Sequence, residues 1–168
     1  MNTVTATVPQ GPPVTAIRLE VLPDKTLPAQ GPGRAANGNF VLSEFNAKAL
    51  TNGPEKTEKI IKFSNVTADY SQNGWPVANA RDQKEDTGWG IAGSIGRSHI
   101  ATFQTAAETP IKAGTTLVFT MSQQFSDGQH SIGKFRLFVE QGMPESNAVK
   151  VPEQPVKKDN QKKKAPNS

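Results

Sequence analysis

The sequence predicts an all-β protein, an antiparallel β-sandwich of the jelly-roll type, from three observations. Several short segments alternate apolar with polar side chains, as strands with one buried face do. The segments between them are rich in Gly, Pro and Ser, which favour turns, and none has the apolar spacing of a helix. A chain of 168 residues with 35% hydrophobic content can bury one core. We therefore expect a single domain of about seven or eight strands.

The first strand is expected at about 16–22, because Ile17, Leu19 and Val21 alternate there with two charged residues. The apolar side chains of such a strand face the core, and the charged ones face solvent. The other expected strands lie at 39–50, 58–70, 89–93, 99–105, 115–125 and 133–141. Segments rich in turn-forming residues separate them, as an antiparallel fold requires.

Three of these segments carry more detailed expectations. In 39–50 the inward residues are expected to be Phe40, Leu42 and Phe45. The segment 58–70 departs from strict alternation, which predicts a bend or a β-bulge within it. The segment 115–125 has the strongest alternation and is expected in the middle of a sheet.

The chain divides into three parts by composition and charge. Residues 1–15 are expected to be an N-terminal linker, 16–141 the β-sandwich binding module, and 142–168 a Lys/Pro-rich C-terminal linker. The net charge of +4 falls entirely in the last 19 residues, with six Lys against two acidic residues, because the preceding part balances 13 basic with 13 acidic residues. A nucleic-acid-binding fold carries a basic face on its folded body. We therefore expect no nucleic-acid partner.

Other partners and cofactors are limited by what the sequence lacks. With no Cys, the chain has no disulfide, no thiolate metal site and no CxxCH attachment for haem. No segment approaches the ~20 consecutive apolar residues of a membrane-spanning helix. The N-terminus also lacks the cationic start and apolar centre of a secretion signal. We therefore expect no haem and no membrane span, and take the chain to be a module excised from a larger protein.

The sequence does not favour an enzyme. Only two imidazole bases are present, His99 and His130, and neither lies in a nucleophile-elbow or zinc-protease motif. Asp82 and Asp86 could in principle act as a glycosidase pair, but both lie on one short turn. They are therefore not expected to flank a sugar bond from opposite sides. We expect a binding protein without catalytic residues.

The turn DQKEDTGW has two interpretations. In the first, Asp82 accepts backbone N–H groups, Thr87 closes the loop and Trp89 turns into the core. In the second, Asp82 and Thr87 supply oxygen ligands to a structural Ca²⁺, with backbone carbonyls and a later acid such as Glu140. The positive charge of Lys84 in the same turn argues against the ion. Both interpretations remain open.

A loop with the sequence SQNGWP holds the main candidate for ligand binding. Trp75 is flanked there by turn residues, so its indole is expected to be exposed and to stack against a sugar ring, although it could also anchor the loop. The candidate ligand-binding residues are Trp75, Tyr70, Gln72, Asn73, Arg34 and His99. For the last two, a structural role is the alternative. Gln123 and Gln124 join this site only if the loop after them lies at the same end as Trp75.

Four blocks of the sequence resemble a known family. The segments 17–45, 68–91, 99–105 and 130–140 together are similar to a β-sandwich module of large planctomycete proteins that also carry cytochrome-type and planctomycete-specific domains. The resemblance implies a multidomain, exported parent protein. It therefore implies a periplasmic or extracellular location and contact with neighbouring domains.

A more remote similarity covers residues 66–89. This part is similar to the discoidin-like, galactose-binding-like superfamily, in which a ligand loop with Trp-Pro precedes an Ala-x-Asp-Gly-x3-Thr-x-Trp motif. The matching positions of the motif are Ala80, Asp82, Thr87 and Trp89. Gln83 stands where glycine is usual and Lys84 where an acidic or amide residue is usual, which weakens the expectation of calcium more than that of the fold. Because such domains bind sugars, lipid head groups or proteins, the fold alone does not identify the ligand.

Two functions from different classes follow. The first is a non-catalytic carbohydrate-binding module, monomeric in isolation, that presents polysaccharide or oligosaccharide to neighbouring domains. The alternative is a structural spacer that packs against its neighbours and has no glycan ligand. A calcium-stabilised adhesion module is a third, weaker hypothesis.

Overall fold

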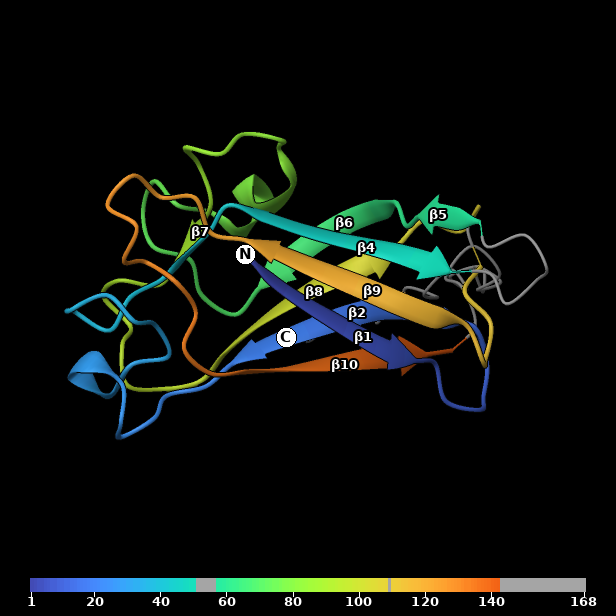
Figure 1. Cartoon of the computed structure of the whole chain (residues 1–168), viewed down its shortest axis with the longest axis horizontal. Helices are drawn as coiled ribbons and strands as arrows, with labels where there is room; N and C mark the ends of the chain where they lie inside the picture. The colour runs from blue at the N-terminus through green and yellow to red at the C-terminus, as the bar shows by residue number, and fades with distance from the viewer. Residues whose placement is uncertain (51–56, 109, 143–168) are drawn as a thin grey trace, which may run out of the picture.

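A computed structural model describes residues 1–50, 57–108 and 110–142, which form an antiparallel β-sandwich (Figure 1). One four-stranded sheet has the order β1-β9-β4-β5, the other has the order β10-β2-β8-β6, and β3 pairs with β7 in a small third sheet. The all-β prediction is confirmed. The strands are β1 (Asn2–Thr7), β2 (Val14–Val21), β3 (Val41–Leu42), β4 (Glu44–Leu50), β5 (Glu58–Ile60), β6 (Phe63–Ala68), β7 (Trp89–Gly90), β8 (His99–Thr105), β9 (Thr116–Ser122) and β10 (Phe135–Gln141); the 3-10 helices are η1 (Pro28–Gln30) and η2 (Val77–Arg81).

Alternating burial along the strands builds the core. In β9 the side chains of Leu117, Phe119 and Met121 are buried, and the intervening residues are more exposed. This strand lies between β1 and β4, so its predicted place inside a sheet is confirmed. The inward side of β2 is likewise fully buried at Leu19, while β10 and β8 pair with β2 on its two edges.

The segment 39–50 divides into two strands around the buried Ser43. The hydroxyl group of Ser43 donates to the carbonyl of Glu85 at 3.1 Å and accepts the N–H of Gln124 at 3.1 Å. These bonds attach the junction of β3 and β4 to the turn before β7 and to the chain just after β9. The predicted inward side chains in this segment, Phe40, Leu42 and Phe45, are all buried.

The segment 58–70 also divides, and the predicted irregularity is confirmed. The chain bends between β5 and β6, where Ile61 turns inward and is 3% exposed. The pairing of β6 with β8 then shifts register between Phe63 and Asn65. A β-bulge of this kind adds one unpaired residue and increases the local twist.

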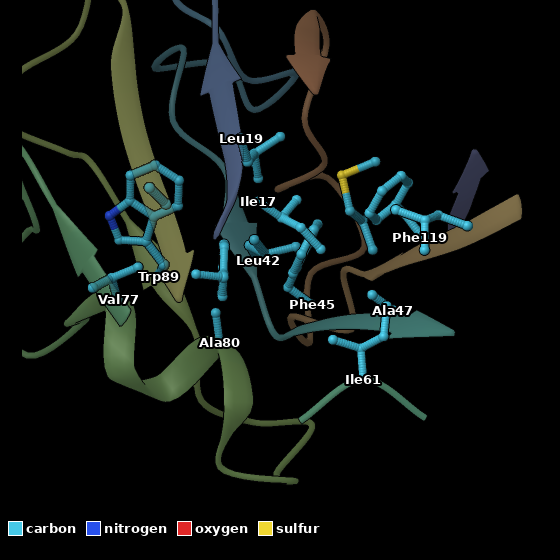
Figure 2. Close-up of a cluster of buried hydrophobic side chains, with 14 of the residues drawn as sticks. Ile17, Leu19, Leu42, Phe45, Ala47, Ile61, Val77, Ala80, Trp89 and Phe119 are labelled. Atoms are coloured by element: carbon cyan, nitrogen blue, oxygen red, sulfur yellow. The ribbon is translucent and has the colours of Figure 1, made fainter. Parts of the chain in front are cut away.

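Trp89 lies at one end of the core (Figure 2). It is fully buried, its indole N–H donates to the carbonyl of Tyr70 at 2.9 Å, and its ring meets that of Phe40 edge-on at 5.1 Å. The helix η2 adds the buried Val77 and Ala80 beside it. The prediction that Trp89 turns into the core is therefore confirmed.

The expected N-terminal linker 1–15 is wrong, because strand β1 lies within it. Asn2–Thr7 pairs with β9 in continuous register, and Val8 and Val14 are 2% and 3% exposed. Alternation is present in this segment, but its residues are mostly Thr and Ala, which give a weak apolar signal. The expected C-terminal linker lies, beyond Gly142, outside the described residues.

Three long connections gather at one end of the sandwich, on the left of Figure 1. They follow β2, β6 and β9 and comprise residues 22–40, 69–98 and 123–134. Backbone bonds join them: the N–H of Arg34 donates to the carbonyl of Ser131 at 2.8 Å, and other loop residues bond across in the same way. Any site formed by loop residues therefore combines segments that are far apart in the sequence.

Candidate functional site

The loop that carries Trp75 is a tight, hydrogen-bonded turn. The N–H of Trp75 donates to the carbonyl of Gln72 at 2.9 Å, and Gly74 has a φ of 80°, which a residue without a β-carbon adopts at little cost. The hydroxyl group of Ser71 accepts the N–H of Val77 at 3.2 Å and closes the loop against η2. This turn holds the half-buried indole outside the hydrophobic core cluster.

Trp75 belongs to a cluster of three rings, which we call the loop-end cluster: Trp75, Phe125 and His130. The indole meets the ring of Phe125 edge-on at 5.3 Å, and Phe125 meets the imidazole of His130 edge-on at 4.8 Å. All three side chains are half-buried. Edge-to-face contacts of this kind favour one relative orientation of the rings, so the cluster is preorganised.

An aspartate orients the imidazole of this cluster. The Nδ1 atom of His130 lies 2.7 Å from the carboxylate of Asp127, which also accepts the N–H of Gln129 at 2.9 Å. The hydrogen bond from His130, followed by that from Gln129, holds the pKa of Asp127 below its usual range. Because the ionised carboxylate only accepts, Nδ1 is the protonated ring nitrogen.

Polar residues adjoin the loop-end cluster in the chain or lie on a neighbouring loop. Asn73 and Gln124 are exposed and adjoin Trp75 and Phe125 in the chain. Arg34 is exposed as well, and its side chain has no hydrogen-bonding partner within the part of the chain that the structure describes. The loop after β9 lies at the same end as Trp75, so the condition set for Gln124 is met.

Gln123 is turned toward the interior. Its Oε1 atom accepts the N–H of Ile132 at 2.6 Å. Its Nε2 atom is shielded from solvent and has no partner among the described residues. Gln123 therefore holds the loop of His130 in place and does not face solvent with Gln124.

A buried amide network lies beneath the Trp75 loop, and Gln72 is part of it. Asn39, which is 4% exposed, accepts the N–H of Ile91 at 2.9 Å and donates to Oε1 of Gln72 at 3.2 Å. The same Oε1 atom accepts the N–H of Ala92 at 3.1 Å. The Oε1 atom of Gln72 is thus used inside the protein, where it connects the Trp75 loop to neighbouring segments, and its contact with a ligand stays a prediction.

Tyr70 and His99 also point inward, contrary to their prediction as ligand-binding residues. The hydroxyl group of Tyr70 donates to the carbonyl of Ala92 at 2.9 Å, and its ring lies 5.5 Å from the imidazole of His99. His99 is fully buried, with Nδ1 3.0 Å from Asp69 and Nε2 2.7 Å from the carbonyl of Ser94. A ligand in solvent cannot reach either ring nitrogen, so His99 is a structural imidazole.

The turn of Asp82 has the hydrogen bonds of an Asx-type turn. The carboxylate of Asp82 accepts the N–H of Lys84 at 3.0 Å and the hydroxyl group of Thr87 at 2.8 Å. Gln83 has a φ of 63°, the left-handed conformation in which glycine is most comfortable. Glu44 accepts the N–H of Gln83, and burial, with a further contribution from Asp82, raises the pKa of Glu44. The first interpretation of this turn is confirmed.

The donor set for calcium is small. Among the described residues, no group of three or more His, Asp or Glu side chains is placed to hold a metal ion. Glu140, named as a further ligand, pairs instead with Arg18 at 3.5 Å. In this structure the carboxylate of Asp82 bonds to Lys84 and Thr87. Calcium binding stays a prediction.

Sequence reasoning missed Phe125 and His130. The segment FSDGQH, at 125–130, places a ring before turn-forming residues, the same signal that identified Trp75 in SQNGWP. What the sequence does not show is that the two turns meet, because 50 positions separate Trp75 from Phe125.

The fold and the site together define a β-sandwich protein with an aromatic cluster at its loop end. Comparison with known proteins adds nothing to this description, because no protein-family model, no curated protein and no solved structure matches the chain. Within the described ranges, no helix is long and apolar enough to cross a membrane.

Proposed function

We propose that this chain is a non-catalytic binding module that recognises carbohydrate with its loop-end cluster. The observation that carries the proposal is the contrast between the two tryptophans of the chain: Trp89 is fully buried, while Trp75 is held outside the core, half-buried, by a hydrogen-bonded turn. The C–H face of a sugar ring packs against such an aromatic surface. The module would present polysaccharide to neighbouring domains of a larger exported planctomycete protein.

The surroundings of the cluster suit a neutral sugar. The exposed Asn73 and Gln124 offer amide donors and acceptors to hydroxyl groups, and Arg34 offers further donors. Asp127 is already engaged with His130. A single sugar on one indole buries little surface, so we expect modest affinity and a preference for polymers, which offer many copies of the epitope.

Affinity gel electrophoresis in gels containing plant and algal polysaccharides tests this proposal. The parent protein should be retarded by at least one polysaccharide, and Trp75→Ala should migrate as it does in a gel without polysaccharide. The matched control is Phe138→Ala, which removes a half-buried ring from the outer face of β10, where it contacts Arg18 at 4.8 Å. Absence of retardation for the parent, or equal retardation of Trp75→Ala, would refute the proposal.

The alternative function, a structural spacer without a glycan ligand, is favoured by a different observation. Apolar side chains on β1 and β10 that face the interior remain partly exposed. A spacer would be inert toward polysaccharides and would still bind its separately produced neighbouring domain, for which co-elution in gel filtration is the measurement.

A further inference from the structure

The side of the sandwich between β1 and β10 is incompletely covered. On β9, Leu117 and Phe119 face the interior and are 1% and 2% exposed. Their cross-strand neighbours on β1 are Ala6 and Val4, which share the same face. Ala6 is nevertheless exposed and Val4 only half-buried. Burial therefore stops abruptly between β9 and β1.

The facing strand shows the same pattern. Each inward residue of β10 is only half-buried, although its cross-strand neighbour on β2 is 0% exposed. The pairs, with the β10 residue first, are Phe135 and Val21, Leu137 and Leu19, and Val139 and Ile17. Apolar side chains from both sheets thus remain partly open to solvent along this one side.

The opposite side of the sandwich is covered in part. There Ile61 turns inward and is 3% exposed, and η2 covers the space between β4 and β6. The guanidinium group of Arg81 donates to the carbonyl of Phe63 at 2.6 Å and fixes η2 to β6. The inward Val66 and Ala68 of β6 are half-buried, as those of β10 are, so what sets the side of β1 and β10 apart is the missing cover and the edge of β1.

Strand β1 also lacks the features that protect a sheet edge. Asn2–Thr7 contains no charge, no Pro and no Gly, and its pairing with β9 shows no bulge. The other edges are protected: β5 is three residues long and mostly charged, β6 has a register shift, and β10 has charges and a register shift near its end. No described strand pairs with the free edge of β1.

We propose that this open side binds one extended peptide strand from a partner protein. The peptide adds to the free edge of β1 through backbone hydrogen bonds and places alternate apolar side chains on Phe135, Leu137 and Val139. None of the inward residues of β1 and β10 that line this side is charged, so the peptide is uncharged there. The unpaired backbone of β1 selects a peptide over an acyl chain, which cannot form these bonds.

The arrangement of the two sheets selects a single strand over a second copy of this chain. In Figure 1, β10 runs along the lower rim of the molecule, and β1 runs obliquely toward it. If a second copy paired its own β1 with this edge, its second four-stranded sheet would overlap the position of β10. A lone strand has no second sheet and fits without this collision.

A fluorescein-labelled peptide of alternating Thr and Val tests the proposal. We expect saturable binding by fluorescence anisotropy. In the ¹⁵N-labelled protein, we expect chemical-shift changes and slower amide hydrogen exchange at Asn2–Thr7. Absence of binding, or changes confined to other strands, overturns the proposal.

Two charge substitutions on neighbouring residues of β1 provide the matched comparison. Ala6→Glu places a carboxylate on the inward face of the strand, and Thr5→Glu places one on the outer face; both positions are exposed, so the fold should tolerate both. Ala6→Glu should weaken peptide binding by about tenfold or more, and Thr5→Glu should change it little. Val139→Glu, on the facing strand, should act like Ala6→Glu. Equal effects of the two β1 variants would count against the proposal.

Other occupants give different results. Sedimentation velocity that shows a dimer of the parent protein, dissociated by Ala6→Glu, would mean that a second copy binds there. Co-sedimentation with phosphatidylcholine vesicles in place of peptide binding would mean an acyl chain. Either result overturns the proposal, and neither bears on polysaccharide binding by the loop-end cluster.

Discussion

Replacing Trp89 with Phe should destabilise the protein far more than the same change at Trp75. Trp89 is fully buried, so Phe leaves a cavity against Phe40 and Val77. It also leaves the carbonyl of Tyr70 without the indole N–H at 2.9 Å. Complete truncation of such a ring costs ~3–5 kcal/mol, and an unsatisfied buried acceptor costs ~1–3 kcal/mol. Because Phe retains much of the ring, we expect a loss of ~2–4 kcal/mol in the free energy of unfolding.

The same substitution at Trp75 is the matched control. Its indole is half-buried, and Phe preserves an aromatic contact with Phe125. We expect a loss of at most ~1 kcal/mol. Urea unfolding followed by far-ultraviolet circular dichroism measures both values without relying on tryptophan fluorescence. Equal losses for the two variants, or a loss below ~1 kcal/mol for Trp89→Phe, would refute this account of the core.

The same variants also separate the two fluorophores, since the chain has two Trp residues. Trp89→Phe leaves Trp75 as the only tryptophan, whose emission acrylamide should quench readily. Trp75→Phe leaves the buried Trp89, which acrylamide should quench weakly. A polysaccharide ligand should change only the emission of Trp75; a response from Trp89 alone would contradict the proposed site.

Three further predictions concern the turns. Thr87→Val removes the hydroxyl group that donates to Asp82 at 2.8 Å, so we expect a loss of ~1 kcal/mol by calorimetry, and no loss would mean that the bond is not needed. A hydrogen bond from Lys134 holds the pKa of Asp24 below its ordinary 3.8. The ionised carboxylate therefore stabilises the folded state above pH 3.8, and this contribution is lost as the pH falls toward the lowered pKa. Lys134→Met should therefore flatten the acid side of the profile of Tm against pH, and an unchanged profile would contradict this. If Ca²⁺ binds the turn, Tm rises with added Ca²⁺ and Asp82→Ala abolishes the rise; no rise in the parent removes the prediction.

The strands were predictable where large apolar residues alternate with polar ones. Leu117, Phe119 and Met121 carry that pattern in β9, and the structure places them inward. Strand β1 alternates in the same way, but mostly with Thr and Ala. Because these residues have little apolar surface, the pattern does not distinguish a strand from a linker. Its position depends on β9, a partner more than a hundred residues away, which the local pattern does not reveal.

The sequence indicated the aromatic residue of the candidate site, but it did not indicate the hydrogen-bonded residues that lie beneath it. Turn chemistry around Trp75 predicted an exposed indole; the indole lies outside the core cluster but is half-buried. Gln72 and His99 were predicted to face a ligand because both are polar and lie near that loop. Gln72 bonds to Asn39, and His99 bonds to Asp69. The two residues of each pair are about 30 positions apart in the sequence, so only the folded chain shows that these polar groups bond within the protein.

The pairing of β1 with β9 has a consequence for folding kinetics. Asn2 lies opposite Met121, and β2 lies between β8 and β10, so neither sheet can close from nearby segments alone. Both sheets need strands from the last third of the described chain, and such distant contacts cost loop-closure entropy before they give any stabilisation. Refolding should therefore take milliseconds to seconds, and truncated chains that end before β9 should have no stable sandwich.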